Sequence, residues 1–305
     1  MATSPPASVR ATKWLPSRQR RFVSPESLPV YAMLGATILF VTTVVVLTDF
    51  YLELGVVAGA AMALMMLAGL GMAARWLSFE RLATALETSA LFSATAIAGP
   101  ICAVIMASTN LPMADSYLAR ADELFFFGFH REVLVNQVKD WNAFMRVTSW
   151  VYHSLLWQPY LLIVLLAAQR KSAQCWRFVA AWCMALGLTL LMFPLAPAVG
   201  TPPYFLDFLD TFNGARDGTL RAIGQQALTG IITFPSFHAA GAVLLGWAYR
   251  SVRPIAVPMV VLNSLMFASA LIAGHYLIDL VAGAAIAAIA VRITRRWAPP
   301  AEVRP

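Results

Sequence analysis

The stretch Thr233-Phe-Pro-Ser-Phe-His-Ala-Ala-Gly241 places a histidine at the head of an uncharged run that continues to Trp247. A proline at the start of such a run predicts a helix N-terminus, because its fixed φ suits the first turn and its missing N–H is no loss there. Unpaired N–H groups and the positive end of the helix dipole can hold an anion at this position. Ser236 is expected just inside the first turn, either to contact the anion or to cap the helix, and His238 follows two residues later.

A second stretch, Gly274-His-Tyr-Leu-Ile-Asp-Leu-Val-Ala-Gly283, has the same character. His275 and Asp279 are four residues apart, which places them on one face of a helix. The chain has four histidines, and two of them open apolar helices in its last quarter.

Composition predicts the fold class. Of 305 residues, 60% are hydrophobic and 12% are charged, whereas soluble domains carry about 25% charged residues. Several uncharged windows of about 20 residues are long enough to cross the hydrocarbon core of a bilayer. We therefore expect an all-α, polytopic membrane helix bundle. The net charge of +7 does not indicate nucleic acid as a partner, because cytoplasmic loops of membrane proteins collect Lys and Arg.

About eight transmembrane helices are expected, a six-helix core preceded by two N-terminal spans. They fall at residues 28–48, 55–74, 88–113, 147–168, 178–199, 235–250, 254–273 and 275–291. The organisation predicted is a basic cytoplasmic tail (1–27), two additional N-terminal helices (28–87), the core (88–297) and a cytoplasmic tail (298–305). The first apolar run is too long for a signal peptide and lacks a small-residue cleavage site, so we expect an uncleaved span.

The mixed segment 114–146 suits one or two amphipathic helices lying at the membrane interface. It contains scattered charges and the aromatic run Phe125–Phe127, which is most simply an interface anchor.

The distribution of basic residues predicts the topology. With the N-terminus inside, all but six of the 22 Lys and Arg residues fall on the inner side, as the positive-inside rule requires. Both termini are then cytoplasmic, and His238 and His275 lie at the outer ends of their helices. We expect an integral protein of the bacterial inner membrane whose site faces the periplasm or exterior.

These residues suit phosphoryl transfer. A carboxylate one turn away, Asp279, can hold one ring nitrogen of His275 and make the other a better nucleophile. A second histidine, His238, can donate a proton to a leaving oxygen. An oxyanion between the two helix N-termini would be held by main-chain N–H groups. Together they describe transfer through a phosphohistidine.

Pro235-Ser-Phe-His238 and His275-Tyr-Leu-Ile-Asp279 resemble the type-2 phosphatidic acid phosphatase superfamily. The Gly-His-Tyr-x-x-Asp-x-x-Ala-Gly form looks like the branch that contains inositol phosphorylceramide synthases and related phosphotransferases. The resemblance covers roughly residues 88–297. It implies that His275 is the nucleophile, that Asp279 orients it and that His238 protonates the leaving group.

Two cationic motifs of the phosphatase branch are missing. Ser269 stands where that branch has an arginine six residues before the nucleophile. Lys139 and Arg146 have the spacing of its Lys-x6-Arg-Pro motif, but Val147 replaces the proline and the pair precedes the fourth span, so we interpret the match as coincidental. Arg216 or Arg221, in the loop before His238, could supply the missing phosphate contact.

Other polar residues have two interpretations. His153 lines the pocket or is a satisfied histidine of the bundle. The loop carboxylates Asp207, Asp210 and Asp217 are ordinary solvated residues rather than metal ligands. No His/carboxylate cluster has ligand spacing, so we expect no metal and no cofactor. Three cysteines at 102, 175 and 183 have no paired spacing and suit small core positions.

The leading functional hypothesis is an integral-membrane enzyme that moves a phosphoryl or phospho-headgroup from a lipid phosphate to a lipid or polyol acceptor. One alternative is a lipid-phosphate phosphatase that releases inorganic phosphate. A further alternative is a non-catalytic transporter, although transporters usually place their site near the midplane on broken helices. The sequence does not indicate the oligomeric state.

Overall fold

The computed structural model describes residues 25–297, which form a helical bundle. Residues 1–24 and 298–305, which hold most of the two predicted tails, lie outside the described residues. In chain order the elements are η1 (Pro25–Ser27), α1 (Leu28–Leu47), β1 (Tyr51–Leu52), α2 (Leu54–Trp76), α3 (Glu80–Ala107), α4 (Asp115–Phe125), α5 (Arg131–Val138), α6 (Asn142–His153), η2 (Ser154–Leu156), α7 (Gln158–Ala168), α8 (Ser172–Met192), η3 (Phe193–Leu195), α9 (Leu209–Asp217), β2 (Ala222–Ile223), η4 (Gln225–Ala227), α10 (Phe237–Tyr249), α11 (Ala256–Ile272) and α12 (Leu277–Trp297).

The predicted all-α polytopic membrane bundle is confirmed as a fold class. Within residues 25–297, five helices are long and apolar enough to cross a membrane: α1, α2, α3, α8 and α12. The expected fourth span is two helices, α6 and α7, which are bent by 50° at a short break. The expected sixth and seventh spans are the apolar helices α10 and α11, which are shorter, at 13 and 17 residues. Pro159 in the first turn of α7 is consistent with the break, because proline favours a helix start.

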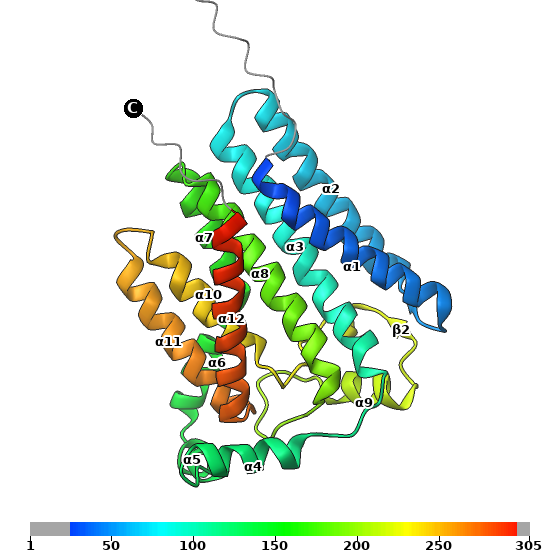
Figure 1. Cartoon of the computed structure of the whole chain (residues 1–305), viewed down its shortest axis with the longest axis vertical. Coiled ribbons are helices and arrows are strands. Elements are labelled where there is room, and N and C mark those ends of the chain that lie inside the picture. Colours follow the sequence, from blue (N-terminus) through cyan, green and yellow to red (C-terminus); the bar gives the residue numbers. More distant parts are fainter. Residues whose placement is uncertain (1–24, 298–305) are drawn as a thin grey trace, which may run out of the picture.

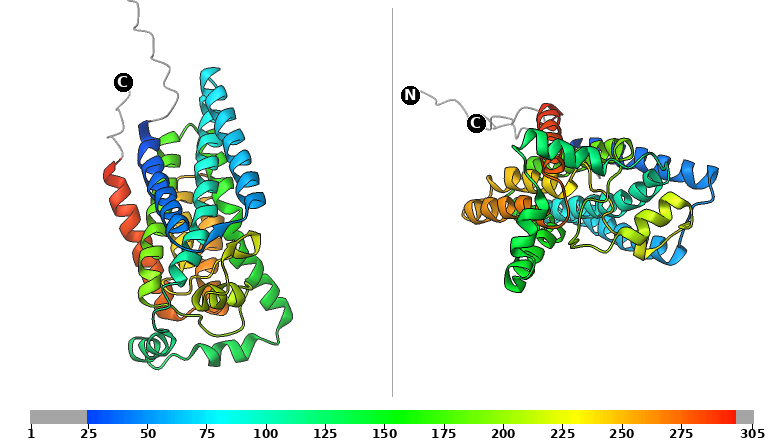
Figure 2. Two further views of the ribbon diagram at one scale, coloured as in Figure 1. Left: turned by 90° about the vertical axis from the view of Figure 1, so that its right-hand side faces the viewer. Right: turned by 90° about the horizontal axis from the view of Figure 1, so that it is seen from below.

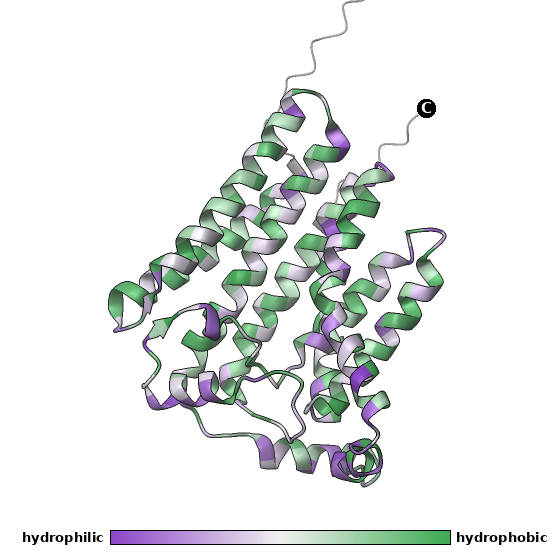
Figure 3. Ribbon diagram, turned by 180° about the vertical axis from the view of Figure 1, so that it is seen from behind, coloured by the Kyte–Doolittle hydropathy of each residue, from purple (hydrophilic) through white to green (hydrophobic). Residues whose placement is uncertain are grey.

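The packing around α8 and α10 forms the main core. Helix α10 packs against α11, α12 and α8, and α3 packs against both α2 and α8. Large side chains such as Trp176, Phe178 and Tyr249 are fully buried in this cluster. Hydrophobic residues cover most of the helices, while hydrophilic residues gather toward their ends and around α4 (Figure 3).

The two N-terminal helices lie at one edge of the bundle (Figure 1). Their surfaces are largely exposed and apolar, as lipid-facing helices require. A polar cluster joins them to α3: the Arg75 guanidinium pairs with Glu87, and the Tyr31 hydroxyl donates to the same carboxylate at 3.3 Å. Removing either charge would leave a buried partner without compensation.

Helices α4 and α5 lie across one end of the bundle, away from the start of α1 and the end of α12 (Figures 1 and 2). The amphipathic segment predicted from residues 114–146 is therefore helical, and α6 begins within its last part, at Asn142. The starts of α10 and α12 lie at this same end, and α4 packs against α12.

Candidate active site

The first turns of α10 and α12 are joined directly. The main-chain N–H of Ser236 donates to the main-chain carbonyl of Asp279 at 3.1 Å. Ser236 is the N-cap of α10, and its hydroxyl accepts the N–H of Ala239 at 3.3 Å. The close approach depends on Gly283, because a Cβ at this position would overlap the carbonyl oxygen of Ser236. The two predicted helix starts are thus brought together, and the capping interpretation of Ser236 is confirmed.

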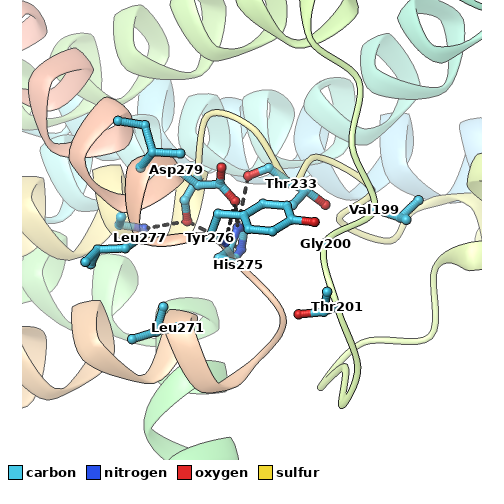
Figure 4. Close-up of polar contacts among 12 residues, drawn as sticks. Val199, Gly200, Thr201, Thr233, Leu271, His275, Tyr276, Leu277 and Asp279 are labelled. Atoms are coloured by element: carbon cyan, nitrogen blue, oxygen red, sulfur yellow. Dashed lines mark hydrogen bonds and ion pairs between the residues drawn. The ribbon is translucent and has the colours of Figure 1, made fainter. Parts of the chain in front are cut away.

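His275 is buried beside Thr233 and Asp279 (Figure 4), and Ser236 is its third polar neighbour. Its Nδ1 lies 2.9 Å from the carbonyl oxygen of Thr233 and 3.4 Å from Oδ2 of Asp279, while its Nε2 lies 3.4 Å from Oγ of Ser236. A carbonyl oxygen can only accept, so the hydrogen bond to Thr233 places the proton on Nδ1. Nε2 is then the unprotonated nitrogen, and its lone pair faces the Ser236 hydroxyl at the start of α10.

Asp279 is fully buried beneath His275. One carboxylate oxygen, Oδ2, accepts the main-chain N–H of Tyr276 at 2.8 Å and lies within ion-pair distance of His275. The other, Oδ1, has no hydrogen-bond partner among the described residues. The carboxylate lies where the sequence predicted it, but the nearest acceptor of Nδ1 is the Thr233 carbonyl. Sequence reasoning missed this group because every residue carries a carbonyl.

The glycine before the histidine shapes the turn that presents it. Gly274 has φ +124°, and a Cβ there would lie 2.7 Å from the Tyr204 ring. Its carbonyl oxygen accepts the N–H of Thr201 at 3.1 Å, which holds the loop after α8 against the turn before α12. Only glycine combines this backbone conformation with this approach.

His238 lies in the first turn of α10, stacked on the ring of Tyr152 with a centroid separation of 3.7 Å and an interplanar angle of 13°. It is close enough to His275 and His153 to interact with both electrostatically. His153 ends α6, and its Nδ1 lies 2.7 Å from the Ser149 carbonyl. Three of the four histidines, from α6, α10 and the turn before α12, therefore lie near one another.

The two loop arginines expected to contact phosphate make their contacts away from His275. Arg216 donates to the carbonyl of Leu111 at 2.8 Å and lies over the Phe212 ring. Arg221 lies over the ring of Phe50 at 5.7 Å. None of these contacts brings a guanidinium to His275, so a phosphate contact by either arginine stays a prediction that would need the loop to move.

A narrow cleft with a volume of ≈ 20 Å³ opens beside His275. Its lining comes from the α6 end, the loop between α8 and α10, and the turn before α12: Tyr152, Val199, Tyr204, Leu206, Phe208, Gly230, Ile232, Thr233, Ala273, Gly274 and His275. At the start of α10, the main-chain N–H groups of Phe237 and His238 donate to no other described group. These free donors and the helix dipole make the region suitable for an oxyanion.

Arg131, on α5, was missed by the sequence analysis. Its side chain is buried, and its guanidinium donates to the carbonyls of Leu271 at 2.6 Å and Ile272 at 2.7 Å. It also donates to Thr201 Oγ1 at 2.6 Å and the Pro202 carbonyl at 3.1 Å. Burial lowers the pKa of the guanidinium, and these acceptors replace its water. One side chain thereby joins the end of α11 to the loop that lines the cleft.

Asp122, on α4, also bonds to main-chain groups beside the site, at the start of α12. Its carboxylate accepts the main-chain N–H groups of Leu277 and Ile278, both at 2.8 Å. Burial raises the pKa of this carboxyl, while the two N–H donors oppose the rise by stabilising its charged form. Asp122 therefore caps α12 from a distant part of the chain.

Asp115 holds the other side of the turn. It accepts the N–H groups of Val199 and Gly200 and the hydroxyl of Tyr276, the last at 3.1 Å. With Arg131 and Asp122 it makes α4 and α5 a strap across the loops that carry His275. The charges of segment 114–146 were visible in the sequence, but their partners are mostly main-chain groups, which no residue pattern reveals.

Among residues 25–297, no group of three His, Cys, Asp or Glu side chains is placed to hold a metal ion. The three cysteines are free and buried, in the core positions expected of them.

A comparison with known protein families identifies the family of this chain. The family model described as "PAP2 superfamily" matches residues 116–293, more than half of the chain. The chain belongs to the PAP2 superfamily, and this membership supports a phosphatase or phosphotransferase acting on lipid-like substrates. Comparisons with curated proteins and with solved structures gave no match.

Proposed function

We propose that this protein is a membrane lipid phosphotransferase that works through a phosphohistidine on His275. The observation that supports this proposal is the geometry of the imidazole: Nδ1 is engaged by the Thr233 carbonyl and approached by Asp279, while the unprotonated Nε2 lies 3.4 Å from the Ser236 hydroxyl, which caps α10. This arrangement gives a nucleophile in one tautomer beside a place for the phosphoryl oxygens.

The reaction has two displacement steps. Nε2 of His275 attacks the phosphorus of the donor, the bond from phosphorus to the leaving oxygen breaks, and His238 gives that oxygen a proton. The acceptor hydroxyl then attacks the phosphohistidine and loses its proton to His238, and the phosphorus–nitrogen bond breaks. Asp279 stabilises the positive charge that develops on His275 during attack.

Transfer to an alcohol is proposed to outpace hydrolysis. Release of free phosphate places a dianion in the site, which favours cationic contacts. Ser269 is buried and its hydroxyl donates to the Met266 carbonyl at 2.7 Å, and Arg131 is fully engaged by the Thr201 hydroxyl and main-chain carbonyls. This cation-poor site supports the inositol phosphorylceramide synthase-like branch over the phosphatase branch.

The site is proposed to open at the outer face of the bacterial inner membrane, with both chain ends cytoplasmic. The support is the basic charge distribution, since the starts of α10 and α12 lie at the end opposite the basic loops. At that interface a lipid or polyol hydroxyl competes well with water.

The test is product analysis with a lipid donor labelled in its phosphate, using purified protein and a panel of acceptors: inositol, ceramide and glycerolipids. The proposal predicts labelled acceptor in excess of inorganic phosphate for at least one acceptor. Label found only as inorganic phosphate under every acceptor would make the protein a lipid-phosphate phosphatase. Failure to turn over any lipid phosphate would favour a non-catalytic role.

A further inference from the structure

A second polar cavity lies at the end of the bundle opposite His275. Helices α10 and α12 begin at the site, and the cavity is formed by their last turns, at Trp247 and Arg295, together with Gln174 and Arg177 near the start of α8. Ser251, just after α10, completes the polar lining, and the cavity volume is ≈ 160 Å³. We call this space the basic cavity. The basic cavity lies at the far ends of α10 and α12 from His275, so it is separate from the candidate active site.

Within residues 25–297, no acidic side chain neutralises the positive charge of the basic cavity. Among the described residues neither Arg177 nor Arg295 forms an ion pair. Two buried polar atoms, Nε of Arg177 and Oε1 of Gln174, have no hydrogen-bond partner there. Unpaired buried polar atoms cost free energy, so a cavity lined by them calls for a partner that supplies both an acceptor and a donor.

Neutralisation of a helix dipole accounts for Arg295, which lies in the last turn of α12, but not for Arg177. Cations stabilise helix C-termini, and Lys171 serves in that way by donating to the Ser251 carbonyl at 2.6 Å. Arg177, however, lies in the second turn of α8, far from the C-terminus of that helix, so no helix dipole stabilises its charge. A bound anion would supply the missing counter-charge.

We propose that the basic cavity binds the phosphate head group of an anionic phospholipid. The guanidinium groups of Arg177 and Arg295 would donate charge-assisted hydrogen bonds to the phosphate oxygens. The free Oε1 of Gln174 would accept from a head-group hydroxyl, which favours phosphatidylglycerol over the fully methylated head group of phosphatidylcholine.

A lipid fits the setting better than a soluble phosphate. The cavity lies at the ends of apolar helices, with Leu166 and Ala248 in its wall and the indole of Trp247 beneath Arg295 at 6.0 Å. Tryptophan and arginine at helix ends are typical of the membrane–water boundary, and basic pockets between helices on the inner side bind anionic head groups.

The experiment measures binding of fluorescent phosphatidylglycerol to the purified full-length protein in neutral detergent. Phosphatidylcholine and inorganic phosphate serve as competitors. Wild-type protein should bind phosphatidylglycerol saturably, and neither competitor should displace it. Arg177→Gln and Arg295→Gln should each weaken binding by about tenfold, as expected for one charge-assisted hydrogen bond. Arg253→Gln, at an exposed arginine of the same end outside the cavity, is the matched control and should bind as wild type does.

Equal affinity in all three variants would overturn the proposal. Displacement by inorganic phosphate at comparable concentration would assign the cavity to a free anion instead of a lipid. Arg295 is exposed, so Arg295→Gln should fold normally. If Arg177→Gln does not fold, the affinity of Arg295→Gln alone decides the test. Because the readout is binding, loss of the proposed transferase activity would leave this result unaffected.

Discussion

The main-chain N–H of Ser236 donates to the main-chain carbonyl of Asp279 at 3.1 Å, so the two helices that carry His238 and His275 are fixed to each other at their first turns. The bond uses no side chain. It places the cap of α10 against the residue that lies beneath His275, which accounts for the 3.4 Å separation between Ser236 Oγ and His275 Nε2. Any change that separates these turns should disturb the imidazole before it disturbs the rest of the bundle.

Gly283 offers a test of that contact. Gly283→Ala places a methyl group against the Ser236 carbonyl oxygen, which is main chain and cannot move aside cheaply. Overpacking of this kind costs about 1–3 kcal/mol, so we expect a thermal midpoint lower by several degrees and activity reduced at least tenfold. Gly187→Ala, on α8, has no atom within 4 Å of the added Cβ and should be neutral or slightly stabilising. Equal behaviour of the two variants would show that the close packing is unimportant.

The cap supplied by Asp122 should be measurable. Asp122→Ala removes the acceptor for two N–H groups at the start of α12, and loss of a helix cap costs about 0.5–2 kcal/mol. We expect a lower thermal midpoint and a reduced kcat, because the turn that carries His275 loosens. Asp140→Ala, at an exposed carboxylate between α5 and α6, is the control and should leave both quantities unchanged. An Asp122→Ala protein with wild-type kcat would remove the positioning role.

Arg131 should act as a positioning residue. Arg131→Met leaves the carbonyls of Leu271 and Ile272 without their donor, and each unsatisfied buried group costs about 1–3 kcal/mol. We expect kcat to fall more than KM rises, because Arg131 contacts the loops that form the cleft and its donors are all engaged. Arg131→Lys should recover only part of the activity, since an ammonium cannot span the same acceptors.

Arg120→Met, an exposed arginine on α4, provides the control for this substitution. If Arg131→Met lowered stability while kcat and KM both stayed at their wild-type values, the strap would be purely structural.

Catalysis is expected to be independent of metal and sensitive to vanadate. The groups proposed to hold the phosphoryl oxygens are histidines and helix N–H donors, and vanadate mimics the trigonal-bipyramidal phosphorus between them. Full activity should survive exhaustive chelation, while vanadate should inhibit competitively. Loss of activity with the chelator, restored by Mg²⁺ or Zn²⁺, would contradict this mechanism.

The residue pattern predicted the parts of the fold that depend on hydrophobicity and helix starts. The apolar runs identified α1, α2, α8 and α12, and Pro235 located the start of α10 to within two residues. The break between α6 and α7 was missed, because Ser154 to Trp157 lie inside a run, 147–168, that contains no Asp, Glu, Lys or Arg. Helix α3 begins at Glu80 instead of residue 88, because its first turns contain charged residues that a hydropathy window excludes.

Within the site, the sequence predicted only the contacts that two side chains make with each other. The spacing of His275 and Asp279 indicated their proximity, and the common face of the two helix starts indicated His238. The contacts of Thr233, Arg131 and Asp122 involve main-chain carbonyls and N–H groups, so their importance depends on tertiary placement.

The most direct test of the central claim is to trap the covalent intermediate. Wild-type protein would be mixed with a lipid donor labelled in its phosphate, quenched in base, and examined for label on the polypeptide, with His130→Ala as the control at an exposed histidine outside the site. We expect base-stable, acid-labile label on wild type and on His130→Ala, and neither label nor turnover in a folded His275→Ala protein. Label or substantial turnover that persists in His275→Ala would contradict it.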